Sequence, residues 1–123
     1  MKIKNLMNKP AVSFTEEDLV VNALSKMDQH KINGAPVINK DNEVVGMIVK
    51  ADIYRFLTSD GHTEEYPLNL VMSKNVITAN PEEDIKDVAL RLRQNNIIAL
   101  PITENNKLIG FISIEDILDY LIS

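Results

Sequence analysis

Apolar residues recur along the chain in a pattern that predicts the same series of elements twice. Two stretches carry them at helical spacing: Leu19, Ala23, Leu24 and Met27, then Ile85, Val88, Ala89 and Leu92. Thr15, with Asp18 three residues later, predicts the start of the first helix. Asn80-Pro81-Glu82-Glu83 predicts the start of the second helix, because Asn caps a helix and Pro suits its first turn.

Two pairs of short apolar runs follow these helices, and turn residues separate the runs of each pair. The runs are residues 35–38 with 44–49, and residues 100–103 with 108–114. Each pair predicts a hairpin. A short closing helix is then expected over residues 51–57 and again over residues 115–122. Each half of the chain therefore reads as β-α-β-β-α.

These two series are copies of one internal repeat, offset by about 65 residues. Leu6-Met7-Asn8-Lys9 aligns with Val71-Met72-Ser73-Lys74, and Ala35-Pro36-Val37 aligns with Leu100-Pro101-Ile102. Glu17-Asp18-Leu19 aligns with Glu83-Asp84-Ile85 if one residue is inserted. We assign residues 1–59 to the first repeat, 60–70 to a linker and 71–123 to the second repeat. One such unit cannot bury both faces of its sheet, so the predicted fold is α/β (α+β), with two repeats packed in pseudo-twofold symmetry.

The closing helices carry a wide apolar surface. In the second, the apolar positions are Ile114, Ile117, Leu118, Tyr120, Leu121 and Ile122. They cover about 200° of the helix, given 3.6 residues per turn, which is wider than the arc that faces a single core. Two interpretations stay open: these residues fill the space between the repeats, or they also pack against a second chain as a homodimer.

Composition and charge narrow the possible functions. The 123 residues include 13 Lys and Arg against 18 Asp and Glu, a net charge of −5, which disfavours nucleic acid as a partner. Cys is absent, and the two His stand in no motif with a nucleophile or metal-ligand spacing. No apolar run is long enough for a membrane span, and the N-terminus lacks a signal peptide. We therefore expect a cytoplasmic protein that is not an enzyme and holds no metal.

The tandem motif resembles a known family. An apolar-Pro-Val or apolar-Pro-Ile segment is followed by Gly46-Met47-Ile48 and Asp52 in one copy, and by Gly110-Phe111-Ile112 and Asp116 in the other. This pattern is similar to a pair of CBS domains, named after cystathionine β-synthase and also called a Bateman module. The resemblance implies a regulatory module that binds an adenosine-containing ligand (AMP, ADP, ATP or S-adenosylmethionine) and acts on dimer geometry or on a separate regulated protein.

The resemblance also implies two clefts between the repeats. Each combines the first strand and pre-proline segment of one repeat with the Ser/Thr-x-x-Asp motif of the other. Cleft one would comprise Ser13, Phe14, Asn33, Gly34, Pro36, Ser113 and Asp116. Cleft two would comprise Thr78, Ala79, Ile98, Ala99, Pro101, Asp52, Lys50, His30 and Lys31. In each, the carboxylate would accept hydrogen bonds from the two ribose hydroxyls, and the pre-proline backbone would face the adenine.

Several of these residues also have a structural interpretation. Ser113 and Asp116 form a capping pair in sequence, and Asp52 suits the positive end of a helix dipole. Val49 stands where the family has Ser or Thr, which removes a hydroxyl from cleft two. His30 and Lys31 either contact phosphate in that cleft or form a solvated helix end. The alternative function is a dimerisation or scaffold module that binds no ligand.

Overall fold

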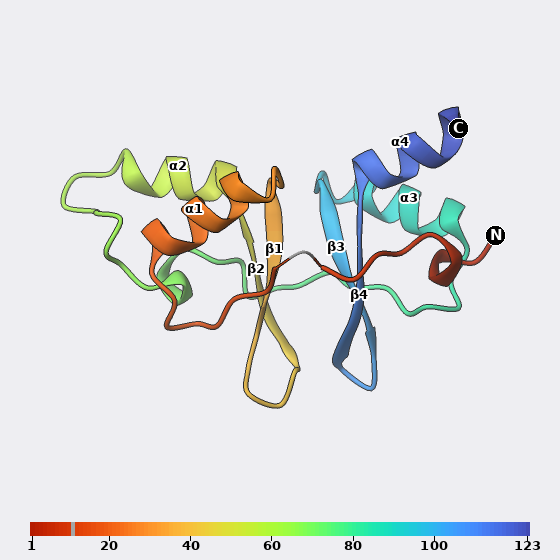
Figure 1. The fold of residues 1–123 in the computed structure, drawn as a ribbon, viewed down its shortest axis with the longest axis horizontal. Coiled ribbons are helices and arrows are strands. Elements are labelled where there is room, and N and C mark those ends of the chain that lie inside the picture. The colour runs from red at the N-terminus through yellow and green to blue at the C-terminus, as the bar shows by residue number, and fades with distance from the viewer. Residues whose placement is uncertain (11) are drawn as a thin grey trace. The chain divides into compact units, whose positions relative to one another are not determined.

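The computed structural model describes residues 1–10 and 12–123 (Figure 1). Over these residues the chain forms four α-helices and two short antiparallel sheets, which confirms the α+β class. The chain divides into two compact units. The first unit is Ala11–Val76, and the second unit combines Met1–Pro10 with Ile77–Ser123.

The first unit is built around one hairpin. Its elements are α1 (Val20–Gln29), β1 (Gly34–Ile38), β2 (Val44–Val49), α2 (Lys50–Leu57) and a 3-10 helix (Leu68–Leu70). Strands β1 and β2 pair antiparallel, with Ala35 opposite Ile48. The predicted hairpin and closing helix are therefore confirmed to within one residue.

The second unit repeats this arrangement. Its elements are a 3-10 helix (Ile3–Asn5), α3 (Ile85–Gln94), β3 (Ala99–Glu104), β4 (Lys107–Ser113) and α4 (Ile114–Ile122). Leu100 lies opposite Ile112 in the β3–β4 pair. The strand expected at the start of each repeat is reduced to one parallel bridge. Phe14 pairs with Val37 in the first unit, and Ala79 pairs with Ile102 in the second.

Both central helices begin later than the sequence predicts. The expected caps, Thr15 with Asp18 and Asn80 with Glu83, form turns instead: the backbone N–H of Thr15 and of Asn80 donates to the acidic side chain three residues on. The helices begin at Val20 and Ile85, after Leu19 and Asp84. The cause is tertiary pairing, because Leu19 bridges Pro67 and Asp84 bridges Lys2 in extended conformation. This pairing overrides the local helix signal.

The one-residue insertion in the repeat alignment is wrong. Equivalent residues in the two units are 65 positions apart up to the first strand of each hairpin. This offset separates the turns at Thr15 and Asn80, the starts of α1 and α3, and the prolines Pro36 and Pro101. The length difference lies in the hairpin turns, because Gly46 and Gly110 are 64 positions apart. The true partner of Glu83 is therefore Asp18, and the chance similarity of two Glu-Asp pairs caused the error.

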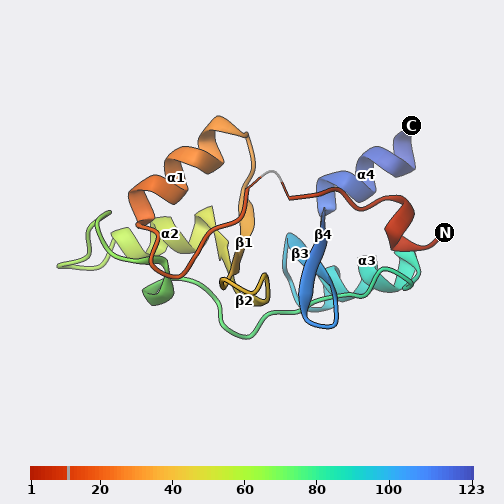
Figure 2. The ribbon, with the colours of Figure 1, turned by 60° about the horizontal axis from the view of Figure 1, so that its bottom comes forward.

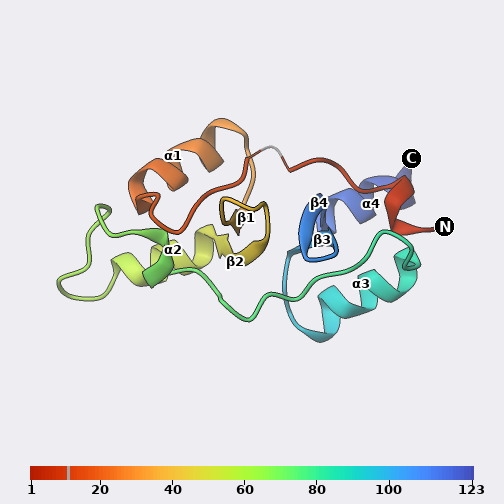
Figure 3. The ribbon, with the colours of Figure 1, turned by 90° about the horizontal axis from the view of Figure 1, so that it is seen from below.

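Each unit has its own core, completed by a segment from near the start of the other repeat. Ile3 and Leu68 are equivalent in the repeat and are fully buried. Leu68 joins the core of the first unit, and the 3-10 helix that contains it is the short green helix near α1 and α2 in Figure 2. Ile3 joins the core of the second unit, where the N-terminal segment runs beside α3 and β4 (Figure 3, red). The backbone N–H of Ile3 donates to the Glu83 carbonyl at 2.7 Å, and that of Leu68 to the Asp18 carbonyl at 2.8 Å.

Candidate functional site

Asp52 is a predicted site residue without a helix-capping bond. It lies in the first turn of α2, whose N-cap residue is Val49, and no side chain caps this helix. The side chain of Asp52 is 30% exposed, and its Oδ1 accepts a hydrogen bond of 3.0 Å from Arg55 Nη1. Arg55 itself is 75% exposed, so the pair is solvated and weak. The carboxylate is therefore available to a ligand.

Asp52 lines an open hollow of about 400 Å³ within the first unit. The other lining residues are Arg55, Phe56, Ser59, His62, Leu70, Val71 and Ser73. The ring of His62 stacks on Phe56 at a centroid distance of 4.0 Å, and its Nδ1 lies 2.9 Å from the Phe56 carbonyl oxygen. Arg55, Ser59, His62 and Ser73 were not expected from the sequence. The helical spacing of residues 52 and 55 could have revealed Arg55, but the other three lie beyond the end of α2.

Asp116 has a structural role as well as an accessible edge. Its Oδ2 accepts from the Ser113 backbone N–H at 2.9 Å, and its own N–H donates to Ser113 Oγ at 3.1 Å, which completes a capping box at the start of α4. Asn8 Nδ2 donates to Oδ1 at 3.3 Å. The carboxylate has about four acceptor sites and accepts two of these bonds, so it keeps capacity for two more donors.

The pre-proline segments are already bonded in part. The Pro36 carbonyl accepts from the Phe14 N–H and the Pro101 carbonyl accepts from the Ala79 N–H, at 3.1 and 3.2 Å. The Asn33 carbonyl accepts a hydrogen bond from the backbone N–H of Lys50, and the Ile98 carbonyl accepts one from the backbone N–H of Ile114. The backbone that was expected to face the adenine therefore already accepts a hydrogen bond at each of these carbonyls. The buried members of the predicted set are Phe14, Gly34, Pro36, Ala79, Ala99 and Pro101, and Ser13, Asn33 and Ile98 are exposed.

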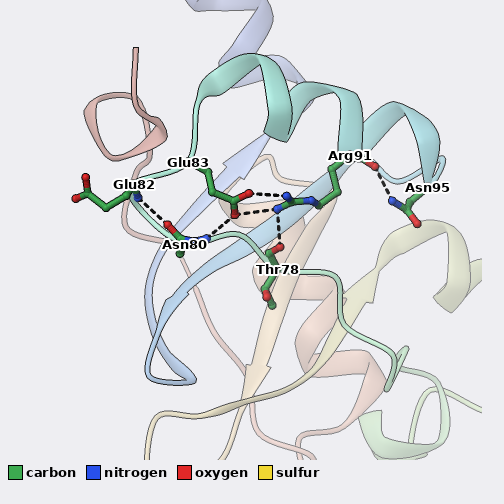
Figure 4. Close-up of polar contacts among 6 residues, drawn as sticks. All are labelled: Thr78, Asn80, Glu82, Glu83, Arg91 and Asn95. Carbon is green, nitrogen blue, oxygen red and sulfur yellow. Dashed lines mark hydrogen bonds and ion pairs between the residues drawn. The ribbon is translucent and has the colours of Figure 1, made fainter.

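Arg91 holds the backbone of Thr78, another predicted site residue (Figure 4). Its Nη1 donates to the Thr78 carbonyl at 2.9 Å and to Glu83 Oε2 at 3.0 Å, and its Nη2 donates to Glu83 Oε1. The hydrogen bonds from Arg91 lower the pKa of Glu83 below 4.5, and those to Glu83 raise the pKa of Arg91. The equivalent residues in the first unit, Lys26 and Asp18, form no such pair among the described residues.

The predicted cations lie at different places in the first unit. Lys50 pairs with Asp28. His30 and Lys31 are exposed at the end of α1, and in the described part of the chain neither side chain has a hydrogen bond or ion pair. Lys31 has a φ of 56°, a left-handed conformation that its equivalent Asn96 (φ of 54°) adopts more easily. Both interpretations of His30 and Lys31 stay open.

Residues 1–10 and 12–123 contain no cluster of three or more His, Asp or Glu side chains that could hold a metal ion. None of the helices formed by these residues has both the length and the apolar character needed to cross a membrane.

The repeat, the fold and the paired acidic residues define a class of protein. The family model for the CBS domain matches residues 3–59 and again residues 68–123. The chain belongs to the CBS domain family and carries two copies of the domain. The structure supports this, since it superimposes on the CBS domain pair of protein MJ0100, crystallised in complex with 5′-methylthioadenosine and S-adenosyl-L-methionine. The TM-score is 0.89 at 24% identity, over 98% of this chain and 95% of that chain.

Two relatives that match this chain differ in length. An uncharacterized protein of Methanocaldococcus jannaschii is 31% identical, and the alignment covers 99% of this chain and 92% of the relative. Homoserine O-acetyltransferase of Methanococcus vannielii is also 31% identical, over 94% of this chain. In that case the chain spans only 24% of the relative's length.

Proposed function

We propose that the chain is a regulatory module that binds an adenosine-containing ligand in clefts between its two CBS repeats. The ligand class is AMP, ADP, ATP or S-adenosylmethionine, and its binding would change the geometry of a dimer or of a regulated partner. The observation that carries the proposal is Asp52, a part-exposed carboxylate that caps no helix and lines a hollow. The adenosine compounds bound to the CBS pair of protein MJ0100 support the ligand class.

The two acidic residues would serve as ribose acceptors of unequal quality. Asp52 would exchange its solvated bond to Arg55 for two ribose hydroxyls, whereas Asp116 would add the ribose to bonds that it already accepts. An ionised carboxylate makes stronger hydrogen bonds to hydroxyl groups than a neutral acceptor does, and the solvated bond between Asp52 and Arg55 costs little to break. Coupling follows because a ligand that contacts both repeats stabilises one arrangement of them over others.

The apolar surface of α4 supports a homodimer as the assembled form. Ile117 is buried, but Leu118, Leu121 and Ile122 are 52%, 68% and 80% exposed. Only part of the wide apolar surface of α4 is therefore buried in the core of its unit, and the rest is exposed. A second copy of the chain would bury the remainder, and burial of apolar area stabilises association. The same surface favours the alternative function, a dimerisation module without a ligand.

A thermal-shift panel separates the two functions. The purified protein is heated with AMP, ADP, ATP or S-adenosylmethionine, and with guanosine monophosphate as the control. A ligand at 100 times its Kd adds about 2.7 kcal/mol to the free energy of unfolding, which raises Tm by several degrees. Stabilisation by an adenosine compound alone supports the regulatory function. An unchanged Tm with every adenosine compound would favour the scaffold function.

A further inference from the structure

The hollow beside α2 carries more positive and hydroxyl groups than a ribose requires. Among the described residues, the guanidinium group of Arg55 forms a hydrogen bond only with Asp52. The hydroxyl groups of Ser59 and Ser73 have no hydrogen-bond partner within residues 1–10 and 12–123. The stack on Phe56 and the contact with its carbonyl fix the His62 ring. Its Nδ1 donates to that carbonyl, so Nε2 is left for another partner.

These groups match the acceptors of a phosphate. A guanidinium binds phosphate through two parallel hydrogen bonds, and hydroxyl and imidazole N–H groups complete the set. An imidazolium ring donates from both nitrogens, and in that form Nε2 can bond to an anion. All four residues line one hollow, whose volume of about 400 Å³ lies within the range of small-molecule sites.

The spacing of Asp52 and Arg55 fits a sugar that carries a phosphate. They stand three residues apart on α2, roughly 4.5 Å along the helix axis at 1.5 Å per residue. A ribose whose two hydroxyls bond to Asp52 would take this carboxylate from Arg55 and leave the guanidinium unpaired. A phosphate on the same sugar supplies the new partner. A cationic substituent, such as the sulfonium of S-adenosylmethionine, would instead meet the positive charge of Arg55.

We propose that the hollow formed by Asp52, Arg55, Ser59, His62 and Ser73 is a ribose phosphate site, which makes the ligand of the first unit a nucleotide. This inference rests on the proposed function, and it adds the ligand's anionic 5′ group and the residues that bind it. None of these phosphate contacts was expected from the sequence, which assigned that role to His30 and Lys31.

The test compares adenosine with AMP, two probes that differ only in the phosphate. Each is titrated into the wild-type chain and into Arg55→Gln, by calorimetry and by NMR of the Ser59 and His62 amides. Arg93→Gln is the matched control, because Arg93 is also an exposed arginine in the last turn of a helix. A hydrogen bond to a charged group contributes enough for a tenfold or greater change in Kd.

We expect AMP to bind the wild type at least tenfold more tightly than adenosine and to shift the Ser59 and His62 signals. Arg55→Gln should remove this preference without weakening adenosine, and Arg93→Gln should keep it. Equal affinity for the two probes, or equal loss of both in Arg55→Gln, would overturn the phosphate site while the proposed function stands. If neither probe binds the wild type, the phosphate site fails, and the proposed function fails with it when ADP, ATP and S-adenosylmethionine also leave Tm unchanged.

Discussion

The thioether of Met72 packs directly over the α-carbon of Gly46 in strand β2. A Cβ atom on Gly46 would stand 2.6 Å from Met72 Sδ, well inside van der Waals contact. Met7 covers Gly110 in β4 in the same way, also at 2.6 Å. Ser73, next to Met72, exchanges two backbone hydrogen bonds with Met47. The glycines therefore let a segment from near the start of the other repeat pack closely on each hairpin.

The substitution Gly46→Ala should consequently destabilise the chain. We expect a loss of about 1–3 kcal/mol in the free energy of unfolding, the usual cost of overpacking, measured by urea denaturation. Met72→Ala removes the clashing side chain, so the added methyl should cost much less in the Gly46→Ala/Met72→Ala double variant than in the wild type. Two strictly additive losses would show that this contact does not explain the glycine.

The free energy of unfolding should decrease in acid, because protonation of Glu83 weakens its interaction with Arg91. Its hydrogen bonds with Arg91 lower its pKa in the folded chain below 4.5. The unfolded chain therefore binds the proton more tightly, and the stabilisation is complete above pH 4.5 and lost as pH falls through the lower folded value. Glu83→Gln should flatten this part of the profile of unfolding free energy against pH, whereas Glu17→Gln, at an exposed residue, should leave it unchanged. A profile that keeps its full slope in Glu83→Gln would contradict this role.

The substitution Val49→Thr restores a hydroxyl at the N-cap of α2. The position has the extended backbone of an N-cap but no side-chain bond to the helix. A capping hydroxyl adds about 0.5–2 kcal/mol of stability, and we also expect tighter binding of the ligand held by Asp52. Val44→Thr makes the same chemical change at the other end of β2 and serves as the control. If Val49→Thr leaves the calorimetric Kd unaltered, the proposed role of this position in cleft two is incorrect.

Assembly should depend on the exposed face of α4. We expect the wild type to sediment as a dimer and Leu121→Asp as a monomer, because the charge would have to be buried in the interface. Leu90→Asp is the control, since Leu90 is an exposed leucine on α3. A monomeric wild type, or a dimer that survives Leu121→Asp but not Leu90→Asp, would place the interface elsewhere or remove it.

Local patterns predicted the hairpins and closing helices well, because strand and helix periodicity and the turn residues act over a few positions. They failed at the starts of α1 and α3, because Leu19 pairs with Pro67, 48 positions away, and Asp84 pairs with Lys2, 82 positions away. The acidic residues Asp52 and Asp116 were proposed from the repeat and from the family resemblance. Arg55 was overlooked although it is three residues from Asp52 in α2, whereas Ser59, His62 and Ser73 lie outside α2 and line the hollow only in the folded unit.

The central claim is that two carboxylates, Asp52 and Asp116, hold the sugar of an adenosine ligand. Calorimetric titration of AMP into the wild type and into the Asp52→Asn/Asp116→Asn double variant tests it most directly. We predict saturable binding to the wild type and none to the double variant, with circular dichroism showing that both are folded. Equal binding to the two proteins would contradict the account.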